Sequence, residues 1–212
     1  MRLLDLVRKL VGNDTLEIFG ESGTGKTTFC MVLVKEALEE GMKVFYLDTE
    51  RNIKDIPQHE NFIYKYTPDL NEVVNYVMNL PRADLYILDS LGFPVLTKFA
   101  IANMSERGNM LLKAIAITHF LKIATYRHNA IAVVTNQPES EFGKNVPKDQ
   151  LNPFGDKTTY GYKEIWRTSA RMMKGKTEVR IYSWRSRDLG RGTDLVRMEI
   201  TDEGVRYEVL LE

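Results

Sequence analysis

Residues 15–28 read TLEIFGESGTGKTT, in which an apolar stretch runs directly into a turn rich in glycine and threonine. From Gly20 to Thr27 the turn matches the pattern G-x-x-x-x-G-K-[ST] in full, and a helical pattern over Thr27–Glu40 follows it. A strand, such a turn and a helix N-terminus together form a loop whose backbone N–H groups surround a polyphosphate. The sequence therefore predicts a phosphate-binding loop, and a chance glycine-rich turn is the weaker alternative.

The same stretch indicates which side chains meet the nucleotide and its metal ion. Lys26 is expected to neutralise the outer phosphate oxygens of ATP, and the Thr27 hydroxyl to coordinate Mg²⁺. Asp89 ends an apolar stretch and is a second candidate Mg²⁺ ligand, although a strand-end aspartate can also simply cap a turn. The residues predicted to contact the nucleotide are Gly20, Glu21, Ser22, Gly23, Thr24, Gly25, Lys26, Thr27 and Thr28.

Strand and helix patterns alternate along the first two thirds of the chain. Strands are predicted at Thr15–Phe19, Lys43–Asp48, Asn61–Lys65, Asp84–Asp89 and Ile131–Thr135. Helices are predicted at Thr27–Glu40, at Asp69–Asn79 and from about Ser105 to His128, with a loop over Leu91–Met104. This order is typical of an α/β fold, with a mainly parallel twisted sheet and helices on both faces.

The pattern changes after residue 158. Strand-like stretches separated by short turns are predicted at Lys157–Met173, Thr177–Trp184, Leu195–Thr201 and Val205–Leu211. Short turns join antiparallel strands, so we expect an antiparallel extension at the C-terminal end of the sheet. In the preceding long helix, the predicted apolar face consists of Leu111, Leu112, Ile115, Phe120, Ile123 and Ala124.

Composition limits the class of protein. The 212 residues carry 29 basic and 29 acidic side chains, which argues against a globally basic nucleic-acid coat protein. A single cysteine, Cys30, excludes a disulfide framework, and no apolar run is long enough to span a membrane. We therefore expect residues 1–212 to form one domain. We also expect a cytoplasmic protein, either associated with the nucleoid or free of it, that has no membrane partner.

The neutral total hides a basic segment. Residues 141–192 carry 12 basic and 6 acidic side chains, a net charge of +6. Cations next to aromatic rings are typical of single-stranded DNA binding, which makes Lys144, Lys148 and Lys157 candidate DNA contacts. A solvated loop anchored by its aromatic residues is an equally good interpretation, since acidic residues dilute the charge. The other members of the pattern are Phe142, Phe154, Tyr160, Tyr162 and Lys163.

Two further polar residues follow predicted strands. Glu50 lies just beyond the second strand, where it is either a solvated acid or a base that activates water at the outer phosphate of ATP. Gln137 ends the stretch VVTNQ, and an ordinary polar strand end is the alternative to a functional role. Spacing alone does not decide between these interpretations.

The segments GESGTGKTT, FYLDTE, LYILDS and VVTNQ, in this order, resemble the ATPase core of RecA/RadA recombinases. The compact chain looks most like the archaeal RadA paralogues of the RadB and RadC types. The resemblance implies a RecA-like P-loop NTPase core in which Lys26 binds phosphate and Glu50 is the catalytic base. It also implies that Thr27 and Asp89 hold Mg²⁺, and that Gln137 senses the γ-phosphate and signals to the loop behind it.

The resemblance also implies a function. We expect an ATP-binding paralogue that hydrolyses ATP slowly with stimulation by DNA, contacts single-stranded DNA weakly and modulates homologous recombination and repair. Its partner would be a RadA-type recombinase or another paralogue, and an N-terminal DNA-binding domain like that of full recombinases is not expected. The alternatives are a nucleotide-gated adaptor without hydrolysis or DNA binding, and a ring-forming signalling ATPase of the circadian-clock type.

Overall fold

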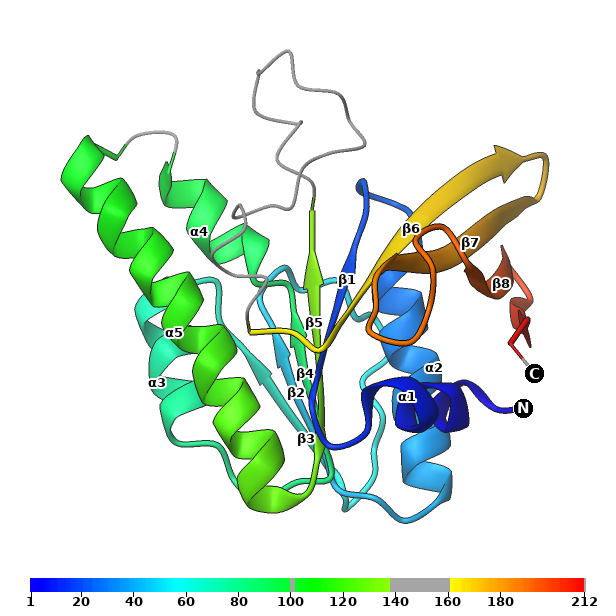
Figure 1. The fold of residues 1–212 in the computed structure, drawn as a ribbon, viewed down its shortest axis with the longest axis horizontal. Coiled ribbons are helices and arrows are strands. Elements are labelled where there is room, and N and C mark those ends of the chain that lie inside the picture. The colour runs from blue at the N-terminus through cyan, green and yellow to red at the C-terminus, as the bar shows by residue number, and fades with distance from the viewer. Residues whose placement is uncertain (100–101, 138–160, 212) are drawn as a thin grey trace.

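The chain folds around one mixed sheet (Figure 1), and the computed structural model describes residues 1–99, 102–137 and 161–211. The sheet has nine strands in the order β3-β2-β4-β5-β1-β6-β7-β8-β9. Strands β1 to β6 pair in parallel, and β6 to β9 pair antiparallel. Their bounds are β1 Thr15–Phe19, β2 Val44–Asp48, β3 Phe62–Tyr66, β4 Leu85–Asp89, β5 Ile131–Asn136, β6 Glu164–Met173, β7 Lys176–Arg185, β8 Asp194–Thr201 and β9 Gly204–Val209.

Helices cover both faces of the parallel part of the sheet. Two of them, α1 (Leu3–Val11) and α2 (Lys26–Glu39), pack on one face, and α3, α4 and α5 pack on the other (Figure 1). The bounds of the latter three are Leu70–Met78, Gly92–Phe99 and Met104–His128. The predicted α/β class with an antiparallel C-terminal extension is confirmed. Among the described helices, none is both long and apolar enough to cross a lipid bilayer.

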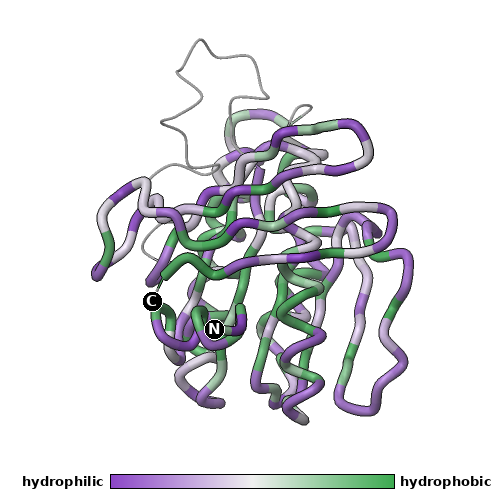
Figure 2. Tube along the Cα trace, turned by 90° about the vertical axis from the view of Figure 1, so that its right-hand side faces the viewer, coloured by the Kyte–Doolittle hydropathy of each residue, from purple (hydrophilic) through white to green (hydrophobic). Residues whose placement is uncertain are grey.

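The C-terminal strands alternate in hydropathy along their length, as Figure 2 shows. On β7, Val179 and Ile181 are buried, whereas Glu178 and Arg180 between and beside them are exposed. A period of two buries one face of a sheet and leaves the other in water. The apolar face of these strands therefore extends the core that α1 and α2 share with the parallel strands.

Three details of the predicted pattern are wrong. The strand predicted over Lys157–Met173 begins at Glu164, and the described residues 161–163 before it are not part of a strand. The segment predicted as a loop contains α4, which tolerates Pro94 because the first turn of a helix has no N–H bond to lose. In α5 the buried apolar face is formed by Ala114, Ile117, Leu121 and Ala124, whereas Leu112 and Ile123 are 64% and 49% exposed. Apolar residues lie on more than one side of α5, so spacing alone did not identify the side that packs.

Glu36 connects the N-terminal helix to the rest of the fold. Its carboxylate is buried and accepts hydrogen bonds from the Leu4 backbone N–H, at 2.7 Å, and from the Tyr207 hydroxyl on β9. Arg2 lies beside it, with Nε 3.9 Å from Oε2. One side chain on α2 therefore holds both the first helix and the last strand.

We predict that Glu36→Ala lowers the free energy of unfolding by about 2 kcal/mol, because a buried N–H and a hydroxyl lose their acceptor. The measurement is chemical denaturation. Glu39→Ala is the control, since Glu39 lies one turn along the same helix, is 54% exposed and also contacts Arg2. It should change the free energy of unfolding by less than about 0.5 kcal/mol. Equal losses in the two variants would contradict this role for Glu36.

Candidate nucleotide-binding site

The glycine-rich turn connects the end of β1 to the start of α2. Gly23 and Gly25 have φ angles of +76° and +80°, a conformation that favours glycine. Lys26, the first residue of α2, is buried, and its Nζ donates to the carbonyl oxygens of Gly20 and Glu21, both at 2.8 Å. The lysine charge and the amino end of α2 therefore lie at the same loop, an arrangement that attracts a phosphate group.

The antiparallel extension packs tightly against this loop. A Cβ added to Gly20 would lie 2.7 Å from the backbone oxygen of Thr168 on β6. A Cβ on Gly25 would lie 3.0 Å from Val179 and 3.3 Å from Ile200. The loop is consequently enclosed by β6, β7 and β8 as well as by its own turn.

Asp89 is the buried carboxylate at the centre of the site. It is 3% exposed and accepts hydrogen bonds from the Thr27 hydroxyl at 2.8 Å, from the Tyr46 hydroxyl at 2.7 Å and from Thr135. Burial raises the pKa of Asp89, and these three hydrogen bonds act in the opposite direction. Burial and the Asp89 charge raise the pKa of Tyr46 well above its ordinary value, so its hydroxyl remains a donor.

The oxygen donors of Thr27 and Asp89 fit a magnesium ion. Mg²⁺ prefers oxygen ligands and usually takes one or two from the protein, with the remainder from water and substrate phosphates. In the described ranges no group of three or more His, Cys, Asp and Glu side chains could hold a metal ion by itself. The two adjacent side chains therefore match a metal that arrives with the nucleotide.

Glu50 lies on the turn after β2, and hydrogen bonds hold that turn. Asp48 accepts the backbone N–H groups of Glu50 and Arg51 at 2.9 and 2.7 Å. One carboxylate oxygen of Glu50 accepts from the Ser90 hydroxyl at 2.5 Å and the other from Asn52 at 3.1 Å. Its carboxylate is thus fixed next to Asp89 by residues from two strand ends.

One pocket of about 410 Å³ brings most of the predicted residues together. It lies over the loop and combines the ends of β2, β4 and β5 with the start of α2. The sequence did not identify Asn52, Thr177 and Ile200 as lining residues. The predicted residues that line the pocket are Ser22, Gly23, Thr24, Gly25, Lys26, Thr27, Thr28, Glu50, Asp89 and Gln137, whereas Gly20 and Glu21 lie at the start of the loop.

The candidate DNA contacts are only partly described. Lys144, Lys148 and Lys157 lie outside the described residues. Tyr162 is buried, and Lys163 donates to the backbone oxygen of Val11 at 3.0 Å. These two residues therefore have structural contacts and do not present a surface to DNA.

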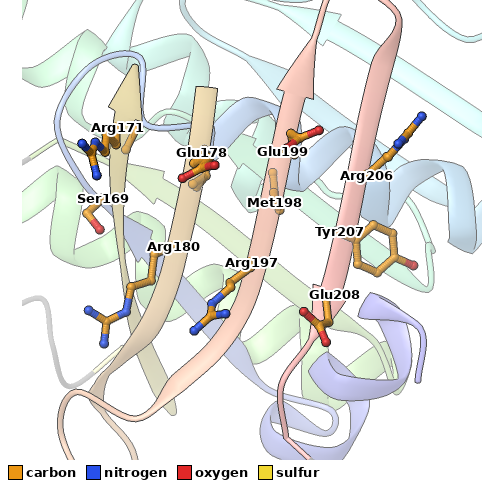
Figure 3. Close-up of a pocket in the computed structure, with 12 residues that line it drawn as sticks. Ser169, Arg171, Glu178, Arg180, Arg197, Met198, Glu199, Arg206, Tyr207 and Glu208 are labelled. Atoms are coloured by element: carbon orange, nitrogen blue, oxygen red, sulfur yellow. The ribbon is translucent and has the colours of Figure 1, made fainter. Parts of the chain in front are cut away.

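A larger hollow, of about 860 Å³, lies on the outer face of the antiparallel strands (Figure 3). Opposite charges face each other between β6 and β7 (Arg171 and Glu178) and between β8 and β9 (Arg197 and Glu208). Like charges face each other between β7 and β8. Lys176 forms ion pairs with Glu178 and Glu199. The hollow is therefore compensated in charge, and none of the predicted nucleotide ligands lines it.

Comparisons with known proteins agree with this geometry, although no family model matches the chain. The chain is 26% identical over 200 residues to protein RecA of Malacoplasma penetrans, covering 88% of the chain and 56% of that protein. It is 23% identical over 208 residues to DNA repair and recombination protein RadB of Methanococcoides burtonii, and this match covers 90% of the chain and 87% of that protein. The crystal structure of the RadB recombinase superposes with a TM-score of 0.68 at 19% identity, over 92% and 91% of the two chains.

The chain has a RecA/RadA-type core close to RadB. The resemblance inferred from four short segments is thereby confirmed. The matched region spans little more than half of the RecA relative, 56% of its length. The RadB likeness extends through the antiparallel strands, because both the sequence match and the structural match reach about nine tenths of the chain.

We predict that Gly20→Ala lowers the free energy of unfolding by about 2–3 kcal/mol, because the new methyl group meets the Thr168 backbone, which cannot rotate away. Gly23→Ala is the matched control. A Cβ there meets no atom within 4 Å, and only the positive φ opposes it, at a cost of about 1 kcal/mol. Thermal or chemical unfolding measures both, and a smaller loss for Gly20→Ala than for Gly23→Ala would contradict the close packing.

Proposed function

We propose that this chain binds ATP with Mg²⁺, hydrolyses it slowly and acts as a recombinase paralogue in homologous recombination and DNA repair. The observation that carries the proposal is the single pocket in which Lys26, Asp89, Glu50 and Gln137 converge over the glycine-rich loop. Similarity to RecA and RadB proteins supports the same conclusion. We further propose that residues 1–212 act as one ATPase unit in the cytoplasm or at the nucleoid.

Each side chain has a role that its surroundings allow. Lys26 is buried beside the loop and would bind the outer phosphate oxygens. Thr27 and Asp89 would hold Mg²⁺, which when bound neutralises charge on the β- and γ-phosphates. Glu50 would accept the proton of the attacking water, and Gln137 would contact the γ-phosphate from the end of β5. The Ser90 hydroxyl would orient the Glu50 carboxylate during proton transfer.

DNA and protein contacts belong to the same proposal. Lys144, Lys148 and Lys157 follow Gln137 in a stretch of net charge +6, which supports weak contact with the phosphates of single-stranded DNA. A RadA-type recombinase or another paralogue is the proposed protein partner. ATP binding at Gln137 would thus control what the basic segment contacts.

One observation favours the adaptor as a second candidate. Both carboxylate oxygens of Glu50 accept hydrogen bonds, from Ser90 and from Asn52. Hydrogen bonds to a carboxylate stabilise its charged form, so it accepts a proton from water less readily. An adaptor would use the same pocket to bind ATP and would change its protein contacts without turnover.

We predict that Glu50→Gln lowers the rate of ATP hydrolysis at least about 100-fold while ATP·Mg²⁺ still binds, because the amide cannot accept a proton. Steady-state hydrolysis and fluorescent-nucleotide binding measure the two effects. Asn52→Ala is the control: it frees one Glu50 oxygen and should leave the rate equal or higher. A wild-type rate that is already negligible, and unchanged in Glu50→Gln, would support the adaptor.

We predict that single-stranded DNA raises the ATPase rate, and that Lys144→Ala, Lys148→Ala and Lys157→Ala together remove this stimulation without changing the basal rate. Each lost phosphate contact weakens binding and reduces its dependence on salt. The matched control replaces three exposed lysines elsewhere, Lys43, Lys54 and Lys65. If both triple variants respond to DNA alike, the basic segment is not the contact.

A further inference from the structure

A cluster of unpaired polar atoms lies beside the nucleotide pocket. In the part of the chain that the structure describes, four buried side-chain atoms have no hydrogen-bond partner. Three of them are Oε2 of Glu17, Oδ1 of Asn136 and the hydroxyl of Tyr162. Buried polar groups without a partner are costly, so three on neighbouring side chains call for a physical reason.

Glu17 and Asn136 lie on the neighbouring strands β1 and β5, and Tyr162 lies just before β6. Glu17 is the central residue of β1 and is fully buried, and its Oε1 accepts from Asn136 Nδ2 at 2.6 Å. Asn136 is the last residue of β5, directly before Gln137, and its backbone oxygen accepts the Gly20 N–H at 3.3 Å. Burial raises the pKa of Tyr162 well above its ordinary value, the nearby Glu17 charge raises it further, and the Asn136 side chain lowers it. Any movement of Asn136 therefore displaces both Gln137 and the first glycine of the loop.

The unpaired atoms are two hydrogen-bond acceptors and one hydroxyl group. Oε2 of an ionised Glu17 and Oδ1 of Asn136 are both acceptors, so neither can satisfy the other. One proton on Glu17 provides the missing donor, and a carboxylic acid can pair with an amide through two hydrogen bonds. When the carboxyl loses that proton to solvent, the neighbouring Tyr162 hydroxyl, which also has no partner, is an available donor.

We propose that Glu17 is a positioning residue for Gln137: as a neutral acid it pairs with Asn136 and fixes the end of β5, and as a carboxylate it takes the Tyr162 hydroxyl and leaves Asn136 less restrained. This inference rests on the proposed function only in assigning a nucleotide role to Gln137. The pairing itself is a property of the nucleotide-free protein.

Burial raises the pKa of Glu17 to about 7, while the hydrogen bond from Asn136 and the charge of Arg185 lower it. Both forms of the side chain are therefore populated near neutral pH. Among the charged side chains on this side of the sheet that the structure describes, Lys122 is paired with Asp14, Lys98 is paired with Asp69, and Arg167 lies over the Trp184 ring. Arg185 is thus the cation that acts on the carboxyl, and it donates to the Tyr162 backbone oxygen.

The sign of the pH effect follows from the raised pKa. The folded protein binds this proton more tightly than the unfolded chain, so the neutral acid is favoured by folding. Stability is therefore full below the unfolded value of 4.5 and is lost as pH rises through about 7. Glu17→Gln keeps the shape and the acceptor, supplies an N–H donor to Asn136 at every pH and should abolish this loss.

The experiment compares wild type, Glu17→Gln and Glu164→Gln between pH 6 and 8.5. Glu164 is a matched control, because it is an equally buried acid at the start of β6 with donors from Trp166 and Ser186. The readouts are the Glu17 carboxyl titration by NMR, amide exchange at Gln137 relative to Glu17→Gln at the same pH, and the pH profile of ATP hydrolysis.

We expect the Glu17 carboxyl group to titrate near pH 7. At pH 6 the rate of amide exchange at Gln137 and the ATPase rate should match those of Glu17→Gln. At pH 8.5 the wild type should exchange faster and turn over more slowly, by about threefold to tenfold. Glu164→Gln should keep the wild-type profile. The inference is overturned if the Glu17 carboxyl group titrates below pH 5. It is also overturned if amide exchange at Gln137 has the same pH profile in Glu17→Gln as in wild type. If Glu17 pairs with Asn136 as expected but the wild-type protein does not bind ATP, the proposed function is overturned instead.

Discussion

A buried carboxylate needs donors, and the Asp89 carboxylate obtains them from three different elements. Thr27 comes from α2, Tyr46 from β2 and Thr135 from β5, so the hydrogen bonds connect β4 to both of its neighbours and to the helix after the loop. Removing an ionised carboxylate from water is expensive unless such partners are present. The arrangement of the pocket therefore depends on the order β2-β4-β5, which brings the Tyr46 and Thr135 hydroxyls to Asp89, and on α2, which supplies Thr27.

The antiparallel extension also constrains the glycine-rich loop of the pocket. Strands β6 to β8 curve over the loop, and Thr168, Val179 and Ile200 approach its glycines at or near van der Waals contact. The loop cannot widen without disturbing these strands. Nucleotide binding and the position of the extension are consequently coupled by contact, and Thr177 and Ile200 line the pocket directly.

Local chemistry could be predicted from the sequence, and contacts between strands could not. The loop is defined by glycines and a lysine within eight residues, and strands β1 to β5 by short apolar runs, so both were predicted at nearly the bounds observed. Asp48 and Tyr46 were missed because their roles depend on which strand lies next to β2. The buried face of α5 was misplaced for a related reason: its apolar residues do not form a single stripe, and only the packed structure shows which of them the sheet covers.

Three buried acids of the sheet show how donor number decides the chemistry of a carboxyl group. Asp89 has three hydroxyl donors and Glu164 has donors from Ser186 and the Trp166 ring, whereas Glu17 has one amide. Burial raises the pKa of all three. Hydrogen-bond donors around a carboxylate stabilise its charged form, and the charged form is the one that binds a cation. A carboxyl group with one donor gains more from holding a proton, and it can then bind its neighbour as an acid. The same sheet thus places a charge where a metal ion is expected, and an acid where two strand ends must be held together.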